Sequence, residues 1–198
     1  MSKSSEKSRI YRLEFDPAYQ SLALADPELL KTPAFQFDST SKANVWSAVE
    51  LVGVDRVKPE PDFWKVEGLP TAFVCNARIL GETPTLSVVT EALPVQFGNR
   101  SLSLVHVNER GCWDALDAQN CVWPLGTPGV GTPTRYAFLP RRLDFTTVMT
   151  VPETCEHEIL VYANFDDPVY EFKADVKKQK LTGLVFRKVW SEKITPSR

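Results

Sequence analysis

The sequence is poor in histidine, methionine and glycine, with two, two and nine of these residues among 198. Two histidines are few for a metal centre or for general-base catalysis, in which histidine is the commonest group. No apolar run approaches the roughly 18 residues that span a bilayer. The polar first eight residues are followed by no apolar stretch of the kind found in secretory signals. We therefore expect a cytoplasmic protein without a membrane partner.

The chain also lacks an excess of positive charge. Lysine and arginine number 23 against 25 acids, which gives a net charge of −2. Proteins that grip nucleic acid need basic surfaces to neutralise phosphates, and aromatic residues are not interleaved with basic ones on any strand that we expect. The sequence therefore predicts no direct nucleic-acid partner.

Cysteine is present but shows no functional spacing. The four cysteines are Cys75, Cys112, Cys121 and Cys155, and their separations match neither zinc sites nor a thioredoxin-like pair. We interpret them as reduced, mostly buried small apolar residues. A chain of this length buries roughly 70% of its extended surface. Stability therefore requires neither a disulfide nor a metal, and we expect no cofactor.

Short apolar stretches separated by glycine, proline and asparagine fill the middle of the chain. Stretches of this kind, bounded by turn residues, are typical of strands. The expected strands cover residues 10–15, 63–66, 71–80, 86–89, 94–97 and 102–107. Between the last two, Gly98 and Asn99 predict a hairpin turn.

The last fifty residues predict a strand, a helix and a second strand. Residues 157–162 are expected to form the first strand, and the acids and proline at 166–168 are typical of a helix start. Gly183 is expected to end that helix in a left-handed conformation, and residues 184–190 to form the closing strand. The sequence therefore predicts an α+β fold. It would hold a mixed, largely antiparallel sheet, a few short helices and a C-terminal strand-helix-strand unit.

Composition also suggests where the chain divides. Residues 1–9 are polar and predict a disordered tail. Two prolines within residues 57–62 forbid a helix and suggest a boundary between an N-terminal lobe over 10–57 and an α+β domain over 58–198. One continuous domain over 10–198 is the alternative. Within the lobe, Asp26 and the proline after it predict a short helix, whereas residues 45–57 fit helical and strand spacing equally.

No catalytic constellation is visible in the sequence. Nucleophilic catalysis needs a thiol or hydroxyl, a base within hydrogen-bond reach and a third group that orients the base. His106 and His157 both fall in expected strands, and we interpret them as strand side chains. Gly-x-Ser-x-Gly, Gly-x-Gly-x-x-Gly and His-Glu-x-x-His motifs are absent. We therefore expect neither catalytic nor metal-binding residues. The alternative is a small cytoplasmic hydrolase or transferase that uses a cysteine with one of these histidines.

The charges are unevenly distributed. Six acids and no lysine or arginine lie between residues 152 and 172. Such a stretch is either a solvated rim or an acidic surface, which attracts a basic partner and accelerates the encounter. Tryptophan suits interface anchors because it buries a large area with few rotatable bonds. Of the five tryptophans, Trp113 and Trp123 lie in turn-rich sequence, and we expect these two to be exposed. The predicted partner-binding residues are Glu153, Glu156, Glu158, Asp166, Asp167, Glu171, Trp113 and Trp123.

Five short sequence segments follow one another along the chain: Lys58–Phe63, Leu93–Val95, Leu104–Asn108, Ala115–Asp117 and Lys180–Phe186. In this order, over about residues 58–190, they resemble the bacterial polymorphic-toxin immunity family called immunity family eleven, formerly a domain of unknown function. The resemblance implies a non-catalytic protein that binds and neutralises a cognate secreted antibacterial toxin by occluding its active or substrate-binding cleft. It further suggests bacterial competition by type VI secretion and a basic nuclease domain as the partner.

Overall fold

The computed structural model describes residues 6–37, 40–107, 115–128, 131–143, 147–154, 157–164 and 171–193. Its strands are β1 (Glu6–Phe15), β2 (Ser21–Leu24), β3 (Val49–Val54), β4 (Phe63–Lys65), β5 (Ala72–Cys75), β6 (Thr90–Phe97), β7 (Arg100–Val107), β8 (Val148–Met149), β9 (Leu160–Asn164) and β10 (Leu184–Lys193). Its α-helices are α1 (Ala77–Glu82), α2 (Pro84–Val89) and α3 (Phe172–Lys178). Short 3-10 helices are η1 (Pro27–Lys31), η2 (Pro33–Phe35), η3 (Pro140–Arg142) and η4 (Pro152–Thr154).

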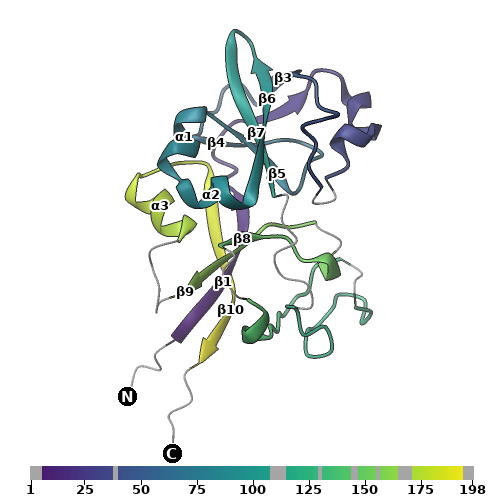
Figure 1. The fold of residues 1–198 in the computed structure, drawn as a ribbon, viewed down its shortest axis with the longest axis vertical. Coiled ribbons are helices and arrows are strands. Elements are labelled where there is room, and N and C mark those ends of the chain that lie inside the picture. Colours follow the sequence, from purple (N-terminus) through teal and green to yellow (C-terminus); the bar gives the residue numbers. More distant parts are fainter. Residues whose placement is uncertain are drawn as a thin grey trace, which may run out of the picture.

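The strands form two sheets, with the orders β10-β1-β9-β8 and β2-β3-β6-β7-β5-β4. In Figure 1 the four-stranded sheet lies below the six-stranded one, and both chain ends lie at the lower end. The β3–β6 pair is parallel, and the other neighbouring strands are antiparallel. The predicted α+β fold with a mixed, largely antiparallel arrangement is confirmed. The C-terminal unit is β9, α3 and β10, and its two strands flank β1 rather than each other.

The six-stranded sheet curls until its outer strands meet. Leu22 in β2 forms an isolated bridge with Val66, which directly follows β4, and the Glu67 amide donates to the Leu22 carbonyl at 2.8 Å. One apolar cluster draws residues from all six strands and therefore fills the concave side, because alternate side chains of a strand point to the same face. The contact between β2 and β4 shields two edges that would otherwise expose unpaired backbone groups.

A second apolar cluster joins the two sheets. It combines Tyr11 and Leu13 of β1 with residues of β5, β7 and α3. At its centre the ring of Phe63 packs edge-to-face on those of Phe73 and Phe172, at centroid distances of 5.5 and 6.0 Å. A third cluster packs residues 115–143 against the other face of the four-stranded sheet. The two sheets therefore share one core.

Strand pairing crosses the boundary expected near residue 57. β3 pairs with β6, and β1 pairs with β9 and β10, so residues 10–57 and 58–198 contribute together to both sheets. The expected disordered tail is wrong for residues 6–9, which belong to β1. There Ser8 is only 1% exposed and pairs with Asn164. These residues are ordered because they pair with a strand about 150 residues further along the chain. The polarity of the local sequence does not predict such a pairing.

Two expected strands are wrong: residues 86–89 belong to helix α2, and within 71–80 strand β5 covers only 72–75 before α1 begins. Asn76 caps α1 and Pro84 begins α2, and both are helix-start signals.

Other local predictions are settled by the described elements. The helix after Asp26 is the 3-10 helix η1, and the Asp26 side chain accepts from the Glu28 amide as its N-cap. The ambiguous stretch 45–57 contains strand β3, and the β6–β7 hairpin turns at Gly98 as predicted. The expected helix start at 166–168 lies outside the described residues. Gly183 is not the helix cap: α3 ends at Lys178, and Lys180 with φ 55° is the first left-handed residue.

Candidate functional site

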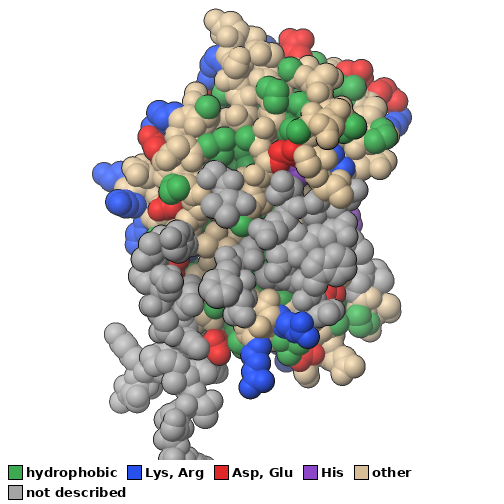
Figure 2. Space-filling view, in the orientation of Figure 1, with side chains coloured by type: hydrophobic (Ala, Val, Ile, Leu, Met, Phe, Trp, Pro, Cys, Tyr) green, Lys and Arg blue, Asp and Glu red, His purple; other side chains and the backbone are tan. Residues whose placement is uncertain are grey.

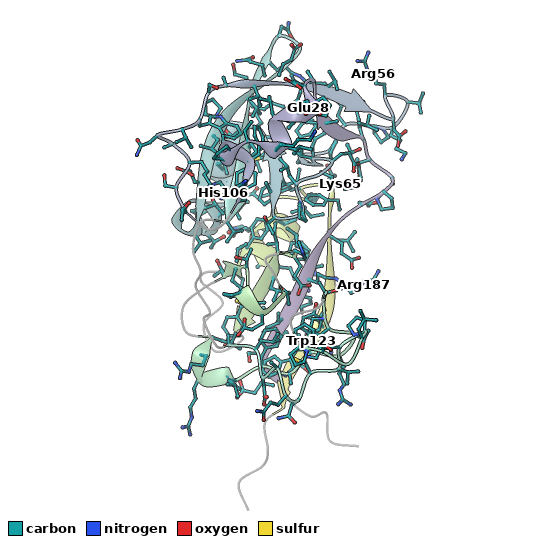
Figure 3. The ribbon with its side chains drawn as sticks, turned by 90° about the vertical axis from the view of Figure 1, so that its right-hand side faces the viewer. Glu28, Arg56, Lys65, His106, Trp123 and Arg187 are labelled. Carbon is teal, nitrogen blue, oxygen red and sulfur yellow. The ribbon has the colours of Figure 1, made fainter. Side chains whose placement is uncertain are left out.

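Two adjoining clefts open where β1 and β10 of one sheet meet β2 and β4 of the other. The first, the turn cleft, has a volume of about 430 Å³ and is lined by Glu14–Pro17, Tyr19–Ser21, Asp55, Lys58, Phe63, Lys65, Glu67 and Gly183. The second, the strand cleft, has a volume of about 460 Å³ and is lined by Arg12, Leu13, Phe15, Lys65–Pro70, Thr132, His157 and Glu158. Because both include Phe15, Lys65 and Glu67, they form one surface, the junction groove. In Figure 3, Lys65 lies between Arg56 above and Arg187 below.

The turn between β1 and β2 is fastened to two distant segments. The Asp16 amide donates to the Gly183 carbonyl, and the Gln20 amide donates to the Pro59 carbonyl, both at 3.0 Å. Within the turn, one oxygen of the Asp16 carboxylate accepts from the Ala18 amide at 2.9 Å, which is the local hydrogen bond that makes aspartate common in turns. The turn is therefore held at both ends by backbone hydrogen bonds, and the Asp16 side chain is held by the Ala18 amide.

The floor of the turn cleft is a close crossing of the chain. One carboxylate oxygen of Asp62 accepts from the amide and the hydroxyl of Thr182, each at 2.8 Å, and the Phe63 amide donates to the Thr182 carbonyl at 3.1 Å. Beside them, Gly183 has φ 96°, and a Cβ there would clash with the Phe63 carbonyl oxygen and lie 2.7 Å from the Pro61 Cβ. Glycine permits both this conformation and this approach.

Acids outnumber bases around the turn cleft by four to two. Both lysines are matched, since Lys58 pairs with Asp55 at 2.8 Å and Lys65 pairs with Glu67 at 2.7 Å. The hydrogen bond from Lys65 is the main reason why the pKa of Glu67 lies below its ordinary value. Asp16 makes no ion pair among the described residues. Glu14 is also matched, since it pairs with Arg12 at 2.7 Å and with Arg187 at 3.0 Å. The carboxylate of Asp16 is therefore the acid of the cleft that can still accept a cationic ligand.

Each cleft holds one buried oxygen without a donor. Gln20 is 6% exposed, and its Oε1 has no hydrogen-bond partner among the described residues. Glu158 is 4% exposed; its Oε2 accepts from the Tyr136 hydroxyl at 2.6 Å, but its Oε1 is likewise unpaired within the described part of the chain. Burial raises the pKa of Glu158. Buried oxygens without donors are uncommon and destabilising, so both are candidates to receive a donor from a ligand.

The predicted acidic strip does not form one surface. Glu158 interacts with Tyr136 and Arg12, whereas Glu171 interacts with Arg9. Arg9 and Arg12 lie on opposite faces of β1, because strand side chains alternate; the two acids therefore lie on opposite sides of the four-stranded sheet. On the face shown in Figure 2, acidic side chains are scattered among basic ones.

The other predicted partner-binding residues divide into three cases. Glu153 is half-buried in η4. The expected exposure of Trp123 is wrong: it is 6% exposed in the third cluster, and its Nε1 donates to the Ala118 carbonyl at 3.0 Å. Its ring is covered by distant chain segments, which turn-rich sequence does not predict. Glu156, Asp166, Asp167 and Trp113 lie outside the described residues.

His106 belongs to a buried hydrogen-bond network rather than to a nucleophile-base pair. It lies in β7, as predicted, and its Nε2 is 2.8 Å from Glu91 Oε2. Burial raises the pKa of Glu91, but hydrogen bonds from the Lys42 amide, the Ser41 hydroxyl and others outweigh it and lower this pKa to about 2. Because Glu91 stands between Ser41 and His106, the imidazole does not contact the hydroxyl. The network ties residues 41–43 to β6.

The described cysteines are poor nucleophiles. Cys75 is fully buried, and burial raises the pKa of its thiol to about 12. Burial also raises the pKa of Cys121, whose Sγ accepts from the Ala137 amide at 3.2 Å. A thiolate is therefore strongly disfavoured at Cys75. Cys112 and Cys155 lie outside the described residues.

Within the described ranges, no group of three or more histidine, cysteine, aspartate or glutamate side chains is placed to hold a metal ion. None of the described helices is long and apolar enough to cross a membrane. Searches with the sequence found no matching family model and no matching curated protein. The function proposed for the chain therefore rests on the junction groove and on the sequence pattern.

Proposed function

We propose that the chain is a cytoplasmic immunity protein that binds and neutralises a cognate secreted antibacterial toxin, with the junction groove receiving the toxin. The observation that carries this proposal is the chemistry of the groove. Asp16 in the turn cleft makes no ion pair among the described residues, and each cleft contains a buried oxygen that lacks a donor there. A partner with clustered lysine and arginine side chains supplies both the charge and the donors.

A nuclease is the favoured toxin, because an enzyme that holds DNA or RNA presents basic side chains where the phosphates bind. Carboxylates of the groove would take the positions of those phosphates and occlude the substrate cleft, and no chemical step by the immunity protein is needed. The fastened turn at 16–20 favours this mode, since a preorganised surface loses little conformational entropy on binding. The resemblance over residues 58–190 supports the same function, and type VI delivery belongs to the proposal.

The groove replaces the acidic strip as the proposed partner surface. Of the acids of the strip that the structure describes, only Glu158 lines the groove. The alternative of a cysteine- and histidine-dependent hydrolase gains no support from Cys75, whose thiol is buried and whose pKa is raised to about 12.

Protection in living cells tests the proposal. The chain is co-expressed with the toxin domain encoded beside its gene, and growth is compared for wild type, Glu67→Lys and Glu28→Lys. The two variants are matched, because each acid is exposed and pairs with a lysine at 2.7 Å; only Glu67 lies in the groove. We expect wild type and Glu28→Lys to protect and Glu67→Lys to lose protection. Growth arrest with the wild-type chain would refute the immunity function, and equal protection by both variants would refute the groove.

A further inference from the structure

We propose that the turn cleft is a binding pocket for the guanidinium group of one arginine side chain of the partner. This inference rests on the proposed function for the identity of the partner, but the pocket itself is defined by side chains within the cleft. Two acceptors and an aromatic wall define it.

The first acceptor is the Asp16 carboxylate. One of its oxygens accepts from the Ala18 amide at 2.9 Å, while the other has no donor among the described residues, and Asp16 makes no ion pair there. The backbone bonds of Asp16 and Gln20 to Gly183 and Pro59 hold the turn in place. A carboxylate held in this way accepts charge-assisted hydrogen bonds from guanidinium with little reorganisation.

The second acceptor is the side-chain oxygen of Gln20. The amide nitrogen of this side chain faces Gly53, since a Cβ on Gly53 would lie 3.2 Å from it. The Oε1 atom is buried and without a partner among the described residues, although the side chain lines the cleft. Gln20 follows Asp16 by four positions in the same turn. This amide oxygen is not one of the acidic groups of the cleft. An N–H donor from a ligand would give it the hydrogen bond that it lacks.

The wall of the cleft selects arginine over lysine. Phe15 and Tyr19 line it with half-buried side chains, whereas the ring of Phe63 is buried in the core. Guanidinium is planar, weakly hydrated and stacks on aromatic rings, whereas ammonium is a compact and strongly hydrated charge. Guanidinium also carries five N–H donors in one plane, enough for both the carboxylate and the amide oxygen. Asp55 and Glu67 pair with the two lysines of the cleft, and Glu14 pairs with two arginines. The charge of Asp16 is therefore left for the ligand.

The neighbouring strand cleft is less suited to a cation. Arg12 and Lys65 both line it, and the Glu158 carboxylate already accepts from the Tyr136 hydroxyl at 2.6 Å. The arginine is therefore assigned to the turn cleft.

Titration of the full chain with Nα-acetyl-argininamide, followed by NMR at constant ionic strength, tests the pocket. We expect dissociation constants in the millimolar range, as for a single small ligand, with shifts of the Gln20 side-chain amide. Nα-acetyl-citrullinamide, the neutral isostere, and Nα-acetyl-lysinamide should bind at least fivefold more weakly. Binding of either control as tightly as the arginine probe would overturn the assignment.

Two variants locate the site. Asp16→Asn retains an oxygen for the Ala18 amide but removes the charge, and Gln20→Leu replaces the unpaired amide with an apolar side chain of similar size. Each should weaken binding of the arginine probe about tenfold, as expected for loss of a hydrogen bond to a charged group. Glu28→Gln, outside the groove, should leave it unchanged. Unaltered binding by both groove variants, with native-like spectra, would refute the pocket.

The two proposals fail separately. If the toxin binds through the groove but the arginine probe does not bind, the pocket is refuted and the immunity function stands. If the probe binds in the turn cleft but the wild-type chain gives no protection against the toxin, the immunity function is refuted and the pocket stands.

Discussion

Replacement of Gly183 by alanine tests the crossing that builds the turn cleft. With φ 96°, alanine at this position is strained by about 1–2 kcal/mol. Its Cβ would also clash with the Phe63 carbonyl oxygen and approach the Pro61 Cβ to 2.7 Å, and overpacking of this kind costs about 1–3 kcal/mol. We therefore expect a loss of about 2–5 kcal/mol in the free energy of unfolding. Because backbone is one of the two neighbours, a rotamer change cannot relieve the clash.

Gly98→Ala is the matched control. Gly98 also has a positive φ, 61°, but a Cβ there meets nothing within 4 Å, so we expect a loss of about 1 kcal/mol. Both variants are unfolded with urea and followed by tryptophan fluorescence. The Gly183 variant should also bind the arginine probe more weakly, because the Asp16 turn is fastened to the Gly183 carbonyl. Equal losses of stability in the two variants would refute the close crossing.

Three further predictions concern buried groups. The fold lowers the pKa of Glu91 from 4.5 to about 2, so the charge of Glu91 stabilises the fold above pH 4.5, and this stability is lost as the pH falls toward 2. Glu91→Gln should therefore flatten the decline of the unfolding free energy at acidic pH, measured by urea titration, whereas Glu28→Gln should not. The pKa of Glu158 is instead raised by burial, so its ionisation opposes folding as the pH rises above 4.5. The melting temperature of Glu158→Gln minus that of wild type should therefore increase between pH 5 and pH 8. The same difference at both pH values would contradict this. Trp123→Ala should cost about 3–4 kcal/mol in chemical unfolding, since the ring is buried; a loss below 1 kcal/mol would indicate an exposed ring.

Local patterns predicted the fold class and several elements. Alternating apolar residues located β7, Gly98 and Asn99 marked the hairpin, and Asp26 capped η1. These features depend on neighbours within a few residues, so they can be read from the sequence. Strand partners cannot, because β1 pairs with strands more than 140 residues away. For the same reason the order of residues 6–9 and the burial of Trp123 were missed.

The site was less predictable than the fold. Asp16, Gln20 and Gly183 are ordinary turn residues in the sequence, and only tertiary structure brings them to one cleft. Gly183 was a visible signal, but its conformation serves a close crossing rather than a helix end. The acidic strip failed as a single surface because nearness in sequence does not place Glu158 and Glu171 on the same face of a sheet.

Calorimetric titration of the purified chain with the toxin domain that the proposal expects to be encoded beside its gene tests the central claim most directly. The account predicts a one-to-one complex with wild type and with Glu28→Lys, and binding at least tenfold weaker with Glu67→Lys, since a reversed charge in the groove repels a basic partner. No heat of binding with the wild-type chain, or equal affinity of Glu67→Lys and Glu28→Lys, would contradict it.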